Sequence, residues 1–211
     1  MLKKVFMWLF LGFLITFAAS YMAMDNLDII YEVFAKIPYL IVVIFCLPIV
    51  IAVLLSGIIK KIPPVITIIL YIIYCVITGV SLGFVLLSFT ASSIISCLLA
   101  TGIIFLICAF ISWNSDYDFS NWGKILLFSL IGAIVVSLLN YFIFNSELLY
   151  IGINAIVTAI FIGYMLYDVN RIKQEQSNDE DKNLPIQLAF QLYLDLINLF
   201  IRLLELFGRR K

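Results

Sequence analysis

The stretch IPPVITIILYIIYCVITGVSLGFVLLSFTASSIISCLLATGIIFLICAFISWNS, from Ile62 to Ser115, carries no charged residue across its 54 positions. As one helix it would extend about 80 Å, more than twice the roughly 30 Å hydrocarbon core of a bilayer. It must therefore fold back, and the polar, small-residue segment from Ser88 to Ser93 is the place to turn. Two membrane spans are predicted from this stretch, near residues 65–87 and 94–112.

Five further apolar windows flank this stretch, each near the roughly 20 residues that a helix needs to cross a bilayer. Four windows are free of charge, at residues 5–24, 37–59, 125–144 and 148–167. The fifth, residues 186–207, is apolar but interrupted by Asp195, Arg202 and Glu205. We predict an all-α membrane protein of seven transmembrane helices, forming a single integral membrane domain over residues 1–211.

The composition excludes several other classes of protein. Hydrophobic residues make up 64% of the chain and charged residues 12%, whereas a soluble domain is about half apolar and about a quarter charged. Lys+Arg and Asp+Glu balance at 13 each, so there is no basic field for nucleic acid. Histidine is absent, which removes the commonest metal ligand and general base. We expect no cofactor, and the lipid bilayer is the one partner that the composition itself requires.

The basic residues of the short loops predict the orientation of the chain. If all seven segments cross, one side carries Lys3, Lys4, Lys60, Lys61, Lys124, Arg171, Lys173 and Lys182. The loops on the other side carry only Lys36, so the first side, with the N-terminus, is expected in the cytoplasm. Seven crossings also place Arg209, Arg210 and Lys211 outside, against the rule. Either the last segment inserts without crossing, or packing around it overrides these three charges.

The polar residues of the last segment gather on one face of a helix. They are Gln187, Gln191, Asp195, Asn198, Arg202 and Glu205. At 100° per residue they lie within a stripe about 80° wide. A helix lying in the membrane interface is one interpretation, but Asp195 has apolar neighbours throughout and the stripe has no Lys/Arg cluster. A charge near the centre of a span costs on the order of 2.5–3.5 kcal/mol, which indicates function. We predict that the stripe faces a water-accessible cavity.

Asp168, at the end of the sixth span, is the expected partner of Asp195. A short loop joins the sixth and seventh spans, so the two helices are expected to be antiparallel neighbours. Both carboxylates reach a similar depth if the sixth helix continues to Lys173. Two carboxylates in contact in a low dielectric cannot easily both ionise, so they share one proton. For Asp168 taken alone, an ordinary helix-end charge is the alternative.

Other polar and small residues in the spans are interpreted as packing residues. Asn140 and Asn154 are expected to form hydrogen bonds between helices. Gly79, Ser81 and Gly83 are expected to let helices approach closely.

Five motifs occur in order along nearly the whole chain. They are GVSLG at Gly79–Gly83, DFSNWG at Asp118–Gly123, the segment Gly132–Asn140, FIGYMLYD at Phe161–Asp168, and LYLDLINLF at Leu192–Phe200. In order and spacing they resemble the Bax inhibitor-1 family, the transmembrane Bax inhibitor motif proteins. The resemblance implies two three-helix layers around a central C-terminal helix. It further implies a bacterial, pH-sensitive passive calcium leak in the cell (inner) membrane.

The resemblance also implies roles for individual residues. The paired aspartates of the family fall on Asp168 and Asp195, as the pH-sensing gate and as transient calcium ligands. The basic latch of bacterial members falls on Lys60 and Lys61, which lack the planar fork of arginine. Many members of the family have a glutamate at the position of Thr78, so a role that depends on that acid is not available in this chain. Further candidates for a latch or a pore lining are Arg171, Gln191, Asn198, Arg202 and Glu205.

Three classes of function stay open on the sequence. In a channel, which is not an enzyme, the carboxylate pair would contact calcium, a hard cation that prefers oxygen ligands. An intramembrane aspartyl protease also has two aspartates on adjacent spans, but it carries Gly-x-Gly-Asp where this chain has Leu192-Tyr-Leu-Asp195. The missing histidine disfavours a serine-type protease. An adaptor that regulates other membrane proteins is the third class.

Overall fold

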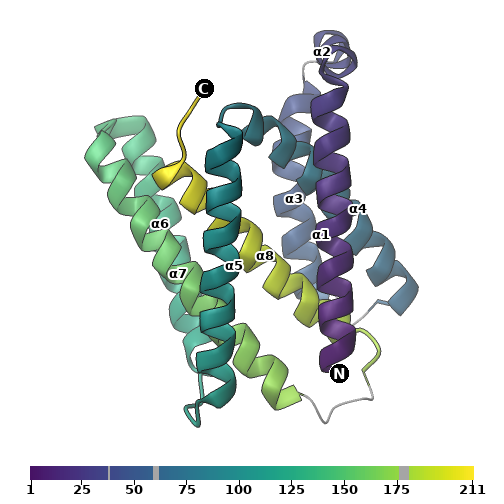
Figure 1. The fold of residues 1–211 in the computed structure, drawn as a ribbon, viewed down its shortest axis with the longest axis vertical. Coiled ribbons are helices and arrows are strands. Elements are labelled where there is room, and N and C mark those ends of the chain that lie inside the picture. Colours follow the sequence, from purple (N-terminus) through teal and green to yellow (C-terminus); the bar gives the residue numbers. More distant parts are fainter. Residues whose placement is uncertain (38, 59–61, 176–180) are drawn as a thin grey trace. The chain divides into compact units, whose positions relative to one another are not determined.

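The computed structural model describes residues 1–37, 39–58, 62–175 and 181–211, and that part of the chain is helical with no β-strand (Figure 1). The prediction of an all-α fold is confirmed. The elements are α1 (Leu2–Asp25), α2 (Leu27–Lys36), α3 (Tyr39–Ile58), α4 (Pro64–Leu87), α5 (Ala91–Asn114), α6 (Trp122–Leu139), the π-helical turn η1 (Asn140–Phe144), α7 (Glu147–Gln174) and α8 (Leu184–Phe207).

Six helices in the described ranges are long and apolar enough to cross a membrane, namely α1, α4, α5, α6 together with η1, α7 and α8. They match six of the seven predicted spans. The second predicted span, residues 37–59, coincides with α3, although residues 38 and 59 lie outside the described ranges. The sixth span is longer than predicted, because α7 continues to Gln174 and encloses Asp168. The chain is therefore a multi-pass membrane protein.

The helices gather into two compact units, and α8 contributes to both. The first unit contains residues 1–89, 178–193 and 211, and the second contains residues 90–177 and 194–210. Each unit therefore has three of the first six spans, which agrees with the three-plus-three division that the family resemblance implies.

An aromatic cluster forms the core of the first unit. Tyr71 and Tyr74 of α4 contact Phe190 and Tyr193 of α8 edge to face, with ring centroids 5.0–6.2 Å apart. All four side chains are buried. Two of the tyrosine hydroxyl groups also have partners, since Tyr193 OH lies 2.6 Å from Thr16 Oγ1 and Tyr71 OH donates to a backbone carbonyl of α1. This cluster anchors the first half of α8.

Small residues bring α1 and α4 into close contact in the same unit. A Cβ atom added at Gly79 would lie 2.5 Å from the carbonyl oxygen of Thr16, and one at Gly83 would lie 3.0 Å from that of Ser20. Ser81 Oγ donates a 2.8 Å hydrogen bond to the carbonyl of Ile44 on α3. The predicted role of these positions in close helix packing is confirmed.

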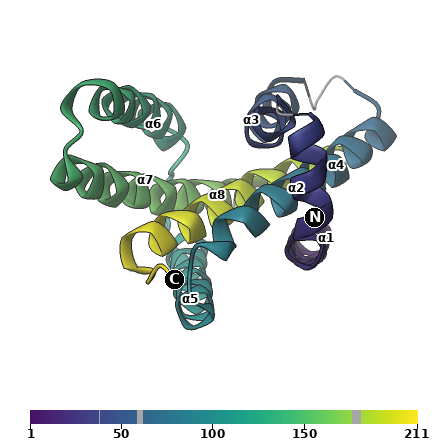
Figure 2. The same cartoon turned by 90° about the horizontal axis from the view of Figure 1, so that it is seen from above.

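In the second unit, α7 packs against both α5 and α6 (Figure 2). Ser112 of α5 is fully buried, and its Oγ donates a 2.8 Å hydrogen bond to the carbonyl of Leu166 on α7. On the α6 side, Gly163 leaves room for Leu126. The second half of α8 contributes Leu199 and Leu204, which are fully buried. The unit is thus an apolar helix assembly in which α7 has neighbours on two sides.

We expect Gly79→Val to destabilise the protein, because overpacking a close helix contact costs about 1–3 kcal/mol. The midpoint of thermal unfolding in detergent, followed by circular dichroism, measures the effect. Gly102→Val is the matched control, since a Cβ atom at Gly102 of α5 meets no described atom within 4 Å. Equal midpoints for both variants would contradict the close-packing role of Gly79.

Candidate functional site

Asp168 of α7 and Asp195 of α8 meet inside the second unit. Their side chains are buried, with exposed fractions of 4% and 5%, and the two carboxyl groups lie within hydrogen-bonding reach of each other. Because α7 continues past Asp168 for more than one turn, the acid lies inside the helix and reaches the depth of Asp195. The structure thus brings together the two acids that the sequence singles out.

A hydrogen bond between two carboxyl groups requires a proton on one of them, since ionised carboxylates only accept. The second oxygen of Asp195, Oδ2, is buried and has no hydrogen-bond partner in the described part of the chain. An unpaired, ionised oxygen in such a place would carry a large desolvation cost. Tyr164, one turn before Asp168 on α7, and Arg171, one turn after it, are the nearby groups that interact with the pair electrostatically. The geometry therefore fits a pair that holds one proton.

A set of hydrogen bonds ties the loop between α5 and α6 to α7 just beyond Asp168. The buried side chain of Asn170 accepts a bond from the backbone N–H of Phe119 at 3.4 Å. Lys173 Nζ donates to the carbonyl of Ser115 at 3.0 Å. The helix segment that carries Asp168 is therefore held from the loop side. These contacts were missed in the sequence, because Asn170 and Lys173 lie more than fifty residues from their partners and no local spacing links them.

Asp118 is the acidic residue of this loop. Its carboxylate accepts 2.9 Å hydrogen bonds from the backbone N–H of Ser120, from the Ser120 hydroxyl and from the side-chain amide of Gln174. These donors favour the charged form and lower the pKa of Asp118 below its usual range. An ionised Asp118 therefore strengthens the connection between the loop and α7.

The polar stripe of α8 is divided between the two units. Asn198, Arg202 and Glu205 are half-buried and belong to the second unit with the aspartate pair, as does Arg171. Gln187 and Gln191 belong to the first unit. Lys60 and Lys61, the predicted latch, lie outside the described residues. The structure brings four of the predicted residues into the unit of the aspartate pair, and their roles stay predictions.

Arg202 forms a second polar centre between α8 and α7. Its Nη1 atom lies 2.7 Å from Asn154 Oδ1 and 2.7 Å from Glu205 Oε2. Asn154 is thus an interhelical hydrogen-bond partner, as predicted. Its bond to Arg202 was not predicted, because the two residues lie far apart in the sequence and no local spacing links them.

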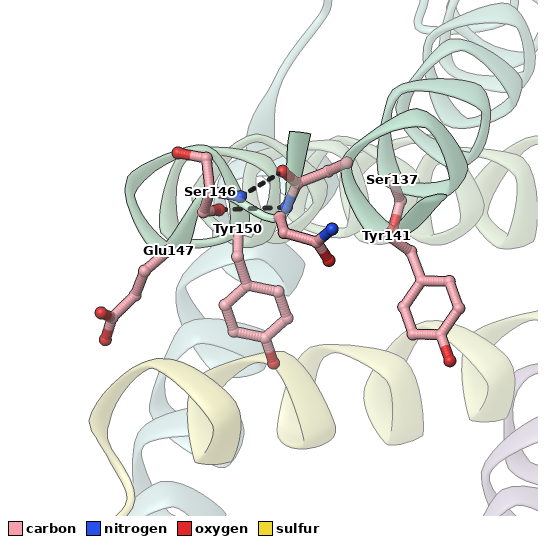
Figure 3. A pocket seen from close by; sticks show the side chains of 7 residues that line it. Ser137, Tyr141, Ser146, Glu147 and Tyr150 are labelled. Carbon is pink, nitrogen blue, oxygen red and sulfur yellow. Dashed lines mark hydrogen bonds between the residues drawn. The ribbon is translucent and has the colours of Figure 1, made fainter. Parts of the chain in front are cut away.

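A cavity of about 350 Å³ lies at the turn from η1 into α7 (Figure 3). Its lining residues are Ser137, Asn140, Tyr141, Asn145, Ser146, Glu147 and Tyr150. The Asn140 side chain bonds both the N–H and the carbonyl of Ser146, at 3.0 and 3.1 Å, and Asn145 adopts a left-handed φ of 46°. Neither aspartate of the pair lines this cavity, so it is a feature of the hairpin turn.

The described residues contain no group of three or more His, Cys, Asp or Glu side chains placed to hold a metal ion. Calcium prefers six to eight oxygen ligands. Asp168 and Asp195 together supply four carboxyl oxygens, which is fewer than this number.

We expect Asp118→Asn to weaken the acid sensitivity of the fold. Because the pKa of Asp118 is lowered in the folded protein, its stabilising effect is complete above the unfolded pKa of about 3.9 and is lost as the pH falls through the folded pKa. Thermal midpoints in detergent between pH 6 and pH 3 should therefore fall less in the variant than in the parent. Asp116→Asn, in the same loop, is the control, and an unchanged pH profile for Asp118→Asn would refute the role.

Comparisons with known proteins give the same family as the residues. The whole chain, residues 1–211, matches the family profile Bax1-I, Inhibitor of apoptosis-promoting Bax1. The chain is 30% identical to the inner membrane protein YbhL of Escherichia coli (strain K12), over 100% of this chain and 92% of YbhL. An uncharacterised protein of Borreliella burgdorferi is 31% identical with the same coverage, and one of Rickettsia prowazekii is 33% identical over 68% of this chain and 62% of the relative. The chain therefore belongs to the Bax inhibitor-1 family of membrane proteins.

Proposed function

We propose that this protein is a pH-sensitive passive calcium leak, gated by one proton that Asp168 and Asp195 share. The observation that carries the proposal is the contact of two buried carboxyl groups on two membrane-spanning helices. Membership of a family of multi-pass membrane proteins is consistent with a channel or transport role.

The gate works through the charge of the pair. With one proton, the two carboxyl groups attract each other and hold α7 against α8. When that proton leaves, two like charges about 4 Å apart repel by about 4 kcal/mol at an effective dielectric constant near 20. The repulsion favours separation of the two helices at this point, and the ionised carboxylates become oxygen ligands for calcium. The leak is therefore expected to increase as the pH rises.

The half-buried line on α8 supplies the rest of the proposed path. The residues of this line recur at helical spacing, and each is less buried than three leucines on the same helix. The line consists of Leu194, Asn198, Ile201, Arg202 and Glu205, and the buried leucines are Leu199, Leu203 and Leu204. Polar groups inside a membrane protein generally face the bundle interior or a water-filled space. A calcium ion leaving the aspartate pair would follow this line along α8.

We further propose that the protein lies in the cell (inner) membrane with its N-terminus in the cytoplasm, as the basic loop residues indicate. The relative YbhL of Escherichia coli is an inner membrane protein, which supports the inner membrane as the location.

Labelling of single cysteines in intact cells, with the four native cysteines replaced, tests this orientation. An impermeant maleimide should label Asn26→Cys and Glu147→Cys from outside, and it should label Lys182→Cys only after the cells are opened. All three positions are exposed. Labelling of Arg210→Cys from outside would agree with seven crossings, and protection there would favour a last segment that inserts without crossing. External labelling of Lys182→Cys would refute the orientation.

The shared proton predicts how single and double variants behave. In liposomes with an internal calcium indicator, the parent leak should rise toward the limit of roughly tenfold per pH unit that release of one proton allows. Asp168→Asn and Asp195→Asn should each flatten this dependence, and the double variant should add less than about twofold, because partners in one unit are non-additive. Asp116→Asn, in the exposed loop, is the matched control.

Two outcomes would contradict the shared-proton gate. Normal pH profiles in both single variants, or effects that simply sum in the double variant, would show that the aspartates titrate independently. A paired carboxyl contact is also what an aspartyl protease needs, so the same preparations should be assayed with a transmembrane peptide. Cleavage that is lost in both variants while calcium flux persists would favour the protease.

A further inference from the structure

Arg202 places a positive charge at an unusual position between two membrane-spanning helices. A single nitrogen, Nη1, lies 2.7 Å from Asn154 Oδ1 of α7 and 2.7 Å from Glu205 Oε2 of α8. Arginine usually binds a carboxylate through two nitrogens in a planar fork. Here one nitrogen serves two oxygens from two helices, as a small cation would.

Two further donors of this centre have no partner among the described residues. Arg202 Nε and Asn154 Nδ2 are buried and have no hydrogen-bond partner within the described ranges. Asn154 is only 1% exposed, so its free N–H groups carry a desolvation penalty. A pair that served stability alone would be expected to satisfy these donors. The well-formed feature of the site is instead the placement of one positively charged nitrogen between the Asn154 and Glu205 oxygens.

The Glu205 side of this centre is partly accessible, whereas the Asn154 side chain is buried. The side chains of Arg202 and Glu205 keep 32% and 24% of their surface exposed. Arg202 follows Asp195 by seven residues on α8, which is about 10 Å along the helix axis. It belongs to the same half-buried line as Asn198.

We propose that Asn154 Oδ1 and the Glu205 carboxylate form a second cation site in this unit, and that the Arg202 guanidinium occupies it as a tethered cation that limits calcium passage. This inference rests on the proposed calcium leak. The site supplies one carboxylate and one amide oxygen, the ligand types that calcium prefers, and water completes the coordination. When the guanidinium leaves, the net charge of the site changes from zero to minus one, which favours entry of a cation.

Three variants separate this role from a purely structural ion pair. Arg202→Gln removes the tethered charge and leaves both oxygens in place. Arg202→Lys keeps a positive charge on a flexible stem. The double variant Arg202→Gln/Glu205→Gln removes both charges, so that no unpaired charge is left in the membrane. Circular dichroism and gel-filtration elution in detergent establish that each variant is folded.

Two measurements are made on each folded variant: calcium flux in liposomes at fixed pH, and equilibrium binding of ⁴⁵Ca²⁺ in detergent. Arg202→Gln should raise the flux about tenfold and should bind calcium about tenfold more tightly. About tenfold is the change in affinity expected when one hydrogen-bonded contact of a charged group is removed. Arg202→Lys, which keeps the charge but holds it less firmly, should fall between the parent and Arg202→Gln in both measurements. The double variant should lose the gain in binding.

The outcomes distinguish this inference from the proposed function. Tighter calcium binding by Arg202→Gln, lost again in the double variant, supports the site even if the parent shows no flux, in which case the leak itself is wrong. A folded Arg202→Gln that neither binds more calcium nor conducts more overturns the tethered-cation site, whatever the parent leak. If Arg202→Gln does not fold while the double variant does, and the double variant matches the parent in flux, the pair is structural and the inference is wrong.

Discussion

In the hydrocarbon core of a bilayer, a charged or polar side chain cannot form hydrogen bonds with water and must form them with other groups of the protein. This constraint explains why the polar groups of the second unit occur in contact rather than singly. Asp168 lies against Asp195, and Arg202 lies between Asn154 and Glu205. Each centre joins α7 to α8, so the polar chemistry of the unit is concentrated between two helices. Those two helices become the part of the protein whose contacts depend most on charge.

The two centres differ in how they balance their charge. The aspartate pair contains only acids, so its balance depends on a proton, which the solution can supply or remove. The arginine centre contains both signs and is neutral without any exchange with solution. In the proposals above, the first arrangement serves as the switch and the second as the tethered cation that limits passage. Both leave buried polar atoms unpaired in the described residues, Oδ2 of Asp195 in one case and Nε of Arg202 in the other. A buried unpaired polar atom is rare in native structures and calls for an explanation, such as a functional role or a bound water or ion.

The apolar parts of each unit hold these centres in place. The aromatic cluster around Tyr193 fixes the first half of α8, and the segment just before Asp195 is consequently well anchored. The loop contacts of Asn170 and Lys173 restrain α7 immediately after Asp168. Each aspartate is therefore attached to a segment with firm contacts of its own. In the proposed gate, a change of charge at the pair would act on the contact between α7 and α8.

The helical membrane fold follows from the amino-acid sequence alone, because a chain in lipid must satisfy its backbone within each segment, and length and apolarity then mark the spans. The sequence also indicated the aspartate pair, since consecutive spans with a short connection are expected to be antiparallel neighbours and Asp195 has few other polar partners in reach. The length of α7 past residue 167 and the bond between Asn154 and Arg202 emerge only in the folded protein. These depend on the rotation of one helix against another and on loop contacts such as that of Phe119 with Asn170, which no local pattern of residues encodes.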